Sequence, residues 1–189
     1  KAPGKIIIAG EHFVVHGSFA LAAAIDRSST VRASLTDRSL ISSKKLGLTA
    51  ELPNKVPYRF APLAEALKAT LNYLEEKRGV KIEIEFDIPV SAGLGSSAAG
   101  SVALVAAASS ALGHTLKKEE ITKLAMVSEK IIHGNPSGID PAISTYGGVM
   151  LFKKGKSQRP IKLEKPIDFI VYFSGSGQST SKMIRKFSQ

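Results

Sequence analysis

One stretch of this 189-residue chain, residues 89–100, reads Pro89-Val90-Ser91-Ala92-Gly93-Leu94-Gly95-Ser96-Ser97-Ala98-Ala99-Gly100. In the residues before it, apolar side chains from Val80 to Ile88 alternate with charged ones, and period two is typical of a strand. In the residues after it, small and aliphatic side chains run from Ser97 to Leu112, as in a helix enclosed by other elements. The stretch is therefore predicted to be a glycine turn between a strand and a buried helix.

This glycine turn has the properties of an anion site. Gly93 and Gly95 allow backbone angles that a side chain would forbid and let a ligand approach the main chain. The unpaired N–H groups of the following first helical turn, together with the helix dipole, favour phosphate. A glycine turn is also a common structural connector, so both readings stay open at this point. The spacing matches neither a Walker A loop nor G-x-G-x-x-G.

Composition excludes several classes of protein. The hydrophobic share of 43% and the charged share of 22% are ordinary for a soluble globular chain. The absence of cysteine excludes disulfides, Cys-ligated zinc and thiol catalysis, and the four histidines lack metal-ligand spacing. Serines interrupt the apolar run after Ser97, which argues against a membrane span. We expect a cytoplasmic protein with no secretory leader before the first strand.

The net charge of +10 has three physical explanations, namely a nucleic-acid partner, polyanionic small molecules, or solubility alone. The cations are dispersed, with short clusters at Lys44-Lys45, Lys117-Lys118 and Lys153-Lys154, and no aromatic stripe lies between them. We interpret them mainly as solvated surface with some steering of phosphorylated or carboxylated ligands. Neither a nucleic-acid nor a membrane partner is expected.

Hydrophobic periodicity and turn formers predict the remaining elements. These are strands at 5–9, 19–35 (with a turn or bulge at 26–29) and 168–174, amphipathic helices at 61–78 and 118–132, and a loop region with short strands at 36–60. Glu129 falls at the edge of the apolar arc of the second amphipathic helix. A carboxylate there is usually solvated or in a salt bridge, although it can also reach into a cleft.

Two polar clusters interrupt apolar segments. Residues 133–140 read His-Gly-Asn-Pro-Ser-Gly-Ile-Asp, and Asp140 followed by Pro141 fits the N-cap and first position of a helix. Gly10-Glu11-His12 follows the first strand, where Glu11 and His12 could satisfy each other or nearby backbone in a turn. On local chemistry alone, a structural role is the simpler explanation for both clusters.

Together these segments resemble motifs of the GHMP small-molecule kinases. Residues 89–99 are similar to P-x-x-x-G-L-G-S-S-A-A, the phosphate-binding signature of that family. Residues 2–17 resemble A-P-G-K-x-x-x-x-G-E-H-x-V-V-x-G of its mevalonate kinase branch at every fixed position, and residues 133–140 resemble H-G-x-P-S-G-x-D of the same branch. Gly147-Gly148 fits the pattern of this branch as well.

The resemblance implies an α+β fold, the GHMP kinase N-terminal domain, which is ribosomal protein S5 domain 2-like. That domain is expected over residues 1–166, and residues 167–189 are expected to begin a ferredoxin-like C-terminal domain that is largely absent from this chain. The implied reaction is ATP- and Mg²⁺-dependent phosphorylation of mevalonate to 5-phosphomevalonate in isoprenoid biosynthesis. Another GHMP kinase, such as a phosphomevalonate kinase, and an S5-like RNA-binding domain are the alternatives. A homodimer is left open.

The resemblance also assigns roles to residues. It places Asp140 beside the hydroxyl to be phosphorylated, with Lys5 holding that carboxylate and the transferring group by charge. Mg²⁺ is assigned to Ser97 and Glu129, with Ser96 as the alternative to Ser97. The acceptor is assigned to Glu11 and His12, and also to Thr180, whose alignment the additional Ser181 makes uncertain. The nucleotide phosphates are assigned to Ala92, Gly93, Leu94, Gly95, Ser96, Ser97 and Ala98.

Overall fold

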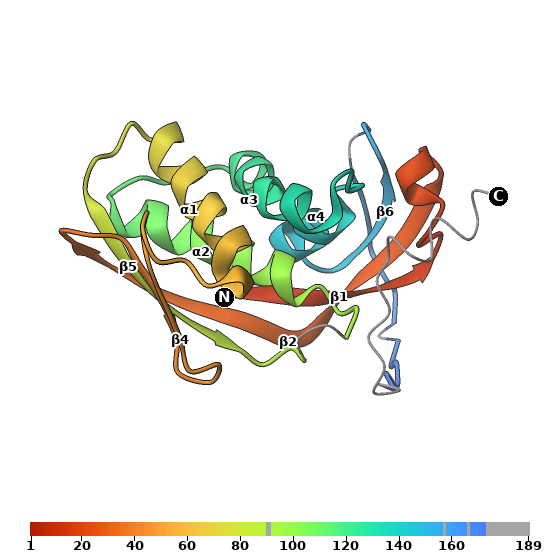
Figure 1. Cartoon of the computed structure of the whole chain (residues 1–189). Coiled ribbons are helices and arrows are strands. Elements are labelled where there is room, and N and C mark those ends of the chain that lie inside the picture. The colour runs from red at the N-terminus through yellow and green to blue at the C-terminus, as the bar shows by residue number, and fades with distance from the viewer. Residues whose placement is uncertain (90–91, 157, 166, 173–189) are drawn as a thin grey trace.

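A computed structural model describes residues 1–89, 92–156, 158–165 and 167–172 (Figure 1). The described chain forms two layers, with one mixed β-sheet and four α-helices that cover a single face of it. The sheet is seven-stranded, with the order β4-β3-β5-β2-β6-β7, and β1 pairs with β2 outside this path. This arrangement is an α+β fold, as the sequence predicted.

The strands are mostly antiparallel, and β3 with β5 is the parallel pair. Their bounds are β1 Ala2–Ala9, β2 Phe19–Thr36, β3 Leu40–Ser43, β4 Leu48–Glu51, β5 Gly79–Phe86, β6 Val149–Lys153 and β7 Arg159–Ile161. The long strand β2 pairs with β1, β5 and β6. Its register with β1 shifts between Ala24 and Ser28, so the predicted irregularity at 26–29 is a bulge within one strand.

The helices follow the predicted order with altered ends. Their bounds are α1 Ala61–Tyr73, α2 Ser96–Ala111, α3 Lys118–His133 and α4 Ile139–Tyr146, and the short 3₁₀ helices are η1 Val14–His16 and η2 Tyr58–Phe60. Helix α1 ends before the predicted residue 78. Its last turn gives way to Glu75 in a left-handed conformation, and Glu76 then accepts hydrogen bonds from the backbone N–H groups of Lys77 and Arg78. The Glu76 side chain thus stabilises a turn where the periodicity predicted helix.

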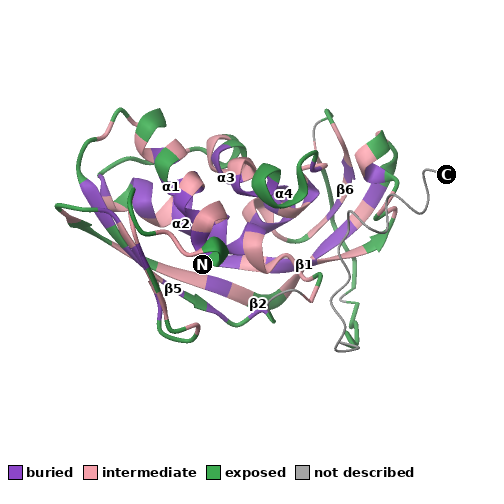
Figure 2. Cartoon of the chain, viewed as in Figure 1, coloured by how far each residue is buried: buried purple, intermediate pink, exposed green. Residues whose placement is uncertain are grey.

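The core lies between the sheet and the helix layer (Figure 2). The alternation predicted for β5 is confirmed, because Val80, Ile82, Ile84 and Phe86 are all buried. Helix α2 contacts β2 as well as α1, α3 and α4, and its own small apolar residues allow these elements to pack around it. A Cβ atom on Gly100 would lie 3.0 Å from the Phe86 ring, so glycine permits close packing of α2 on β5.

The strand predicted at 168–174 is wrong over its described part. Residues 168–172 form no strand, and Ile170 and Tyr172 are 101% and 89% exposed. A strand needs a hydrogen-bonded neighbour, and no described segment pairs with these residues. Separately, within the described ranges no helix is both long enough and apolar enough to cross a bilayer.

Candidate active site

Lys5 in β1 connects two parts of the site that are far apart in the sequence. Its backbone N–H donates to the carbonyl of Leu94 at 2.9 Å, which ties β1 to the glycine turn. Its Nζ lies 3.2 Å from Oδ2 of Asp140 at the start of α4. The residue is only 5% exposed, and a buried ammonium requires such a partner. Lys5 therefore contacts the glycine turn through its backbone and Asp140 through its side chain.

The glycine turn leads directly into α2. Gly93 and Gly95 both have positive φ, at 76° and 71°, and Gly95 is the N-cap residue of the helix. Among the described residues no side chain caps this end, so the N–H groups of its first turn are available to hydrogen-bond a ligand. A Cβ atom on Gly95 would lie 2.9 Å from Cγ of Lys5. Glycine is thus required here both for the backbone conformation and for the approach of Lys5.

Asp140 is not the N-cap of α4, and that structural reading of the sequence is wrong. Gly138, with φ of 91°, is the N-cap, and Asp140 lies in the first turn of the helix. The chain can turn tightly at a glycine without a side-chain cap, which leaves the Asp140 carboxylate to pair with Lys5. About a fifth of its side chain, 21%, is exposed, so the carboxylate is accessible to a ligand.

Glu129 of α3 is buried, contrary to the solvated position that is usual for a carboxylate at the edge of an apolar arc. It is 3% exposed and lies beside the Lys5–Asp140 pair. The pKa of Glu129 is raised to about 8, chiefly because the group is buried and also because of the charge of Asp140, while the charge of Lys5 acts in the opposite direction. The imidazole of His133 lies 3.6 Å from Glu129, and burial lowers the pKa of His133. A cation near this carboxylate would favour its ionised form.

A cavity of about 320 Å³ lies against these groups, and we call it the Lys5–Asp140 cavity. Glu11 lines it, whereas the neighbouring His12 is half-buried and is not among its lining residues. Its polar side chains are Lys5, Glu11, His16, Glu129, His133, Asn135, Ser137 and Asp140. Its apolar wall consists of Ile7, Val14, Val15 and Ile139, with Pro136 beside them. The cavity can therefore take a small molecule that has both polar and apolar groups.

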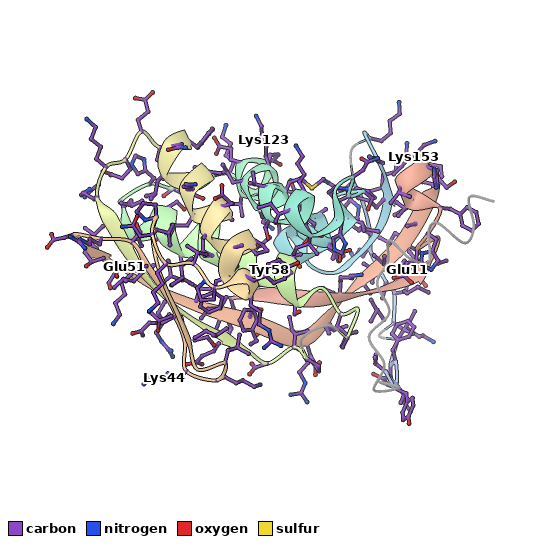
Figure 3. The ribbon with its side chains drawn as sticks, in the orientation of Figure 1. Glu11, Lys44, Glu51, Tyr58, Lys123 and Lys153 are labelled. Carbon is purple, nitrogen blue, oxygen red and sulfur yellow. The ribbon has the colours of Figure 1, made fainter. Side chains whose placement is uncertain are left out.

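A second cavity, of about 420 Å³, lies at the start of α2, and we call it the Ser96–Ser97 cavity. Apart from those two serines and Arg59 its lining is apolar or aromatic: Leu46, Tyr58, Phe60, Ala61, Pro62, Leu63, Phe86, Ile131 and Ile132. Tyr58, almost fully exposed, lies before α1 near the middle of the view in Figure 3, and Glu11 lies toward its right side. The sequence patterns assigned no binding role to these apolar lining residues. The aromatic side chains of Tyr58 and Phe60, in a loop without periodicity, were the feature that could have indicated a binding surface.

The predicted site residues are thus only partly brought together. Lys5, Glu11, Glu129 and Asp140 line one cavity, while Ser96 and Ser97 line the other. Within the glycine turn, Gly93 is exposed and the other residues from Ala92 to Ser97 are half-buried, but Ala98 is buried and its side chain faces the core. Thr180 lies outside the described residues.

The two predicted magnesium ligands do not form a metal site by themselves. In the described part of the chain no group of three or more His, Cys, Asp or Glu side chains could hold a metal ion. Ser97 and Glu129 line different cavities, so their pairing on one Mg²⁺ ion stays a prediction. The raised pKa keeps most of the Glu129 carboxyl protonated at neutral pH, and a cation bound beside it would lower that pKa.

Glu129 should make folding stability depend on pH. In the unfolded chain its pKa is near 4.5, and in the folded protein it is about 8, so between these values only the folded state holds the proton. The contribution of Glu129 to the free energy of unfolding is greatest below pH 4.5. It falls as pH rises toward 8, by up to about 1.4 kcal/mol per pH unit. We expect Glu129→Gln to flatten this slope in urea denaturation at pH 5, 6.5 and 8 without divalent cations. Exposed Glu164→Gln is the control, and equal slopes for wild type and Glu129→Gln would contradict the prediction.

Comparisons with a family model, a curated protein and a solved structure all indicate the same family. The family profile described as the GHMP kinases N terminal domain matches residues 61–148. A mevalonate kinase of Archaeoglobus fulgidus is 40% identical over the whole of this chain and 62% of its own length. The crystal structure of the Methanococcus jannaschii mevalonate kinase superposes with a TM-score of 0.77 at 37% identity, covering 86% of this chain and 55% of that one.

A third relative carries a ligand. The crystal structure of L. major mevalonate kinase in complex with R-mevalonate has a TM-score of 0.71 at 28% identity, and covers 87% of this chain and 52% of that one. The chain spans about 60% of the length of the curated relatives it matches.

Proposed function

This chain belongs to the GHMP kinases, with the α+β fold of their N-terminal domain, and on that basis we propose that the protein phosphorylates mevalonate. In this proposal the γ-phosphate of ATP is transferred to the primary hydroxyl and 5-phosphomevalonate is formed. The 37–40% identity to curated mevalonate kinases over nearly the whole chain supports this acceptor over others in the family. A phosphomevalonate kinase is the alternative. Cytoplasmic location and pairing of two copies remain predictions.

The observation that carries the proposal is the double contact of Lys5. Phosphoryl transfer requires mainly positioning and neutralisation of charge. Lys5 donates its backbone N–H to the glycine turn, and its buried ammonium contacts Asp140. In this proposal the ammonium lies between the phosphate site and the carboxylate. A phosphoryl group passing from the turn toward Asp140 would pass this positive charge, which is where stabilisation of the transition state is needed.

We assign the nucleotide to the first turn of α2 and the Ser96–Ser97 cavity. The uncapped N–H groups after Gly95 suit the phosphates, because they combine donors with the positive end of the helix dipole. The apolar and aromatic lining of the adjoining cavity suits a purine ring. Mg²⁺, held by Ser97 and Glu129 together with phosphate oxygens, would supply charge neutralisation there.

We assign the acceptor to the Lys5–Asp140 cavity. The Asp140 carboxylate, which lines this cavity, would accept the proton of the hydroxyl as the hydroxyl oxygen bonds to phosphorus. Glu11, which lines this cavity, would hold a polar group of a small hydroxy acid, while the role of His12 rests on the resemblance alone because His12 does not line the cavity. The wall of Ile7, Val14, Val15 and Ile139 gives methyl and methylene groups an apolar surface.

A panel of acceptors tests the proposal. The longest form of the protein that can be expressed is incubated with Mg-ATP and mevalonate, phosphomevalonate, galactose or homoserine, and ADP release is measured. We expect release with mevalonate to exceed that with each other acceptor by about a hundredfold, since pocket groups left unpaired by the wrong acceptor are costly. Release with phosphomevalonate and none with mevalonate would favour the alternative enzyme and overturn this choice.

A further inference from the structure

A third cavity, of about 250 Å³, lies where β2, β6 and the turn into β7 meet, and we call it the Arg159 cavity. Its lining residues are Phe19, Leu151, Lys153, Lys156 and Arg159. It shares none of them with the Lys5–Asp140 or Ser96–Ser97 cavities. Nothing in the proposed reaction uses these residues.

The strand register places this cavity on the face of the sheet away from the helices. Phe19 pairs with Lys153, and Leu151 pairs with Arg159, so these side chains share one face. The intervening Ala20 and Phe152 are buried against α4 on the opposite face. Figure 3 shows Lys153 at the same end of the molecule as Glu11.

The cationic side chains of residues 153–159 differ in the contacts they make. Lys153 Nζ lies 4.9 Å from the centre of the Phe19 ring, and Lys154 donates to Asn135 at 2.8 Å. Lys156 and Arg159 are exposed, and within the described residues neither has a carboxylate within the 4.0 Å of an ion pair. Residues 153–159 carry four cations and no acid. Like charges around one small cavity repel, and an anion would relieve that repulsion.

We propose that the Arg159 cavity binds a small anion that carries two or more phosphate groups. The Arg159 guanidinium offers a planar fork that matches phosphate oxygens, and Lys156 and Lys153 supply point charges beside it. The three cations around this cavity carry more positive charge than one carboxylate can neutralise. A diphosphate carries several negative charges and balances them better. The Phe19 ring holds Lys153 at the rim, so its charge is positioned before a ligand arrives.

Inorganic pyrophosphate is the probe for this site. It is titrated at fixed ionic strength into the ¹⁵N-labelled 189-residue chain, and amide shifts are followed separately at 151–159 and at the glycine turn, 93–97. We expect a saturable response at 151–159. The double variant Lys156→Gln/Arg159→Gln should weaken that response by about tenfold or more, since charged hydrogen bonds are lost, and should leave the glycine turn unaffected. Each single variant should lie between the two.

The matched control is Lys55→Gln/Lys123→Gln, which removes two exposed cations elsewhere. It should change affinity at 151–159 by less than about twofold, because neither residue lines the Arg159 cavity and solvent screens exposed charges. Equal weakening by both double variants would show attraction to net charge alone. That result, the lack of saturation at 151–159, or a response there to structured RNA but not to pyrophosphate would each overturn the proposal. Retained amide dispersion in each variant checks the fold.

Discussion

Asp140→Asn is expected to lower the rate of phosphoryl transfer by about a hundredfold or more and to leave nucleotide affinity nearly unchanged. The substitution keeps the size of the side chain and an oxygen that can accept a hydrogen bond from Lys5. It removes the negative charge that would take the proton of the acceptor hydroxyl. Asp140 lies in the Lys5–Asp140 cavity and not in the cavity at the start of α2, so binding of nucleotide should not depend on it.

The same variant should fold with only moderate loss of stability. Removing one partner of a buried ion pair usually costs about 3–5 kcal/mol, because the remaining charge is uncompensated. Here the Asp140 charge is one cause of the raised pKa of Glu129, so its removal should lower that pKa and let Glu129 ionise beside Lys5. We therefore expect a loss of about 1–3 kcal/mol in the free energy of unfolding, which is the range for a weakened hydrogen bond to a charged group.

Three measurements check Asp140→Asn. They are the initial rate of ADP release, nucleotide affinity by calorimetry and unfolding in urea. Exposed Asp37→Asn is the matched control and should behave like the wild type. If Asp140→Asn keeps a rate within about threefold of wild type, Asp140 is a structural partner of Lys5 and takes no proton.

Lys5→Met should have a larger effect, with the rate of transfer reduced by about a hundred- to a thousandfold and nucleotide affinity reduced as well. Methionine preserves most of the apolar stem that packs against Gly95, so the change isolates the ammonium. The Lys5 side chain packs against Gly95 of the glycine turn and its ammonium contacts Asp140, which is why both properties should fall.

The electrostatic consequences of Lys5→Met also have a definite sign. Lys5 lowers the pKa of Glu129, so without it that pKa should rise further and Asp140 should lose its buried counterion. Stability should fall by about 3–5 kcal/mol, as for other broken buried pairs. The exposed Lys123→Met is the control for loss of one charge, and its unfolding and nucleotide affinity should match the wild type. Unchanged nucleotide affinity in Lys5→Met would separate Lys5 from the phosphate site.

Much of the scaffold could be predicted from local pattern. Patterns among neighbouring residues predicted the alternating burial of β5, the glycine turn and the buried helix α2. The structure contains all three. The irregularity in β2 was also predicted, because Asp26 and Arg27 interrupt an apolar run. Ends of elements were less certain. Helix α1 stops early because Glu76 stabilises a turn, and residues 168–172 form no strand.

Periodicity and glycine freedom are properties of the sequence itself, and they predicted the strands, the buried helix and the glycine turn between them. The resemblance of three motifs to the GHMP kinases implied the α+β class and most candidate residues. The resemblance already implied that Lys5 holds Asp140, and the structure shows that contact. Only the tertiary structure decided that Glu129 is buried with a raised pKa, that Asp140 does not cap α4, and which side chains line the cavities. The physical reason is that burial and charge pairing depend on segments that are distant in the sequence. Lys5 and Asp140 are 135 positions apart, and no local pattern encodes their 3.2 Å contact.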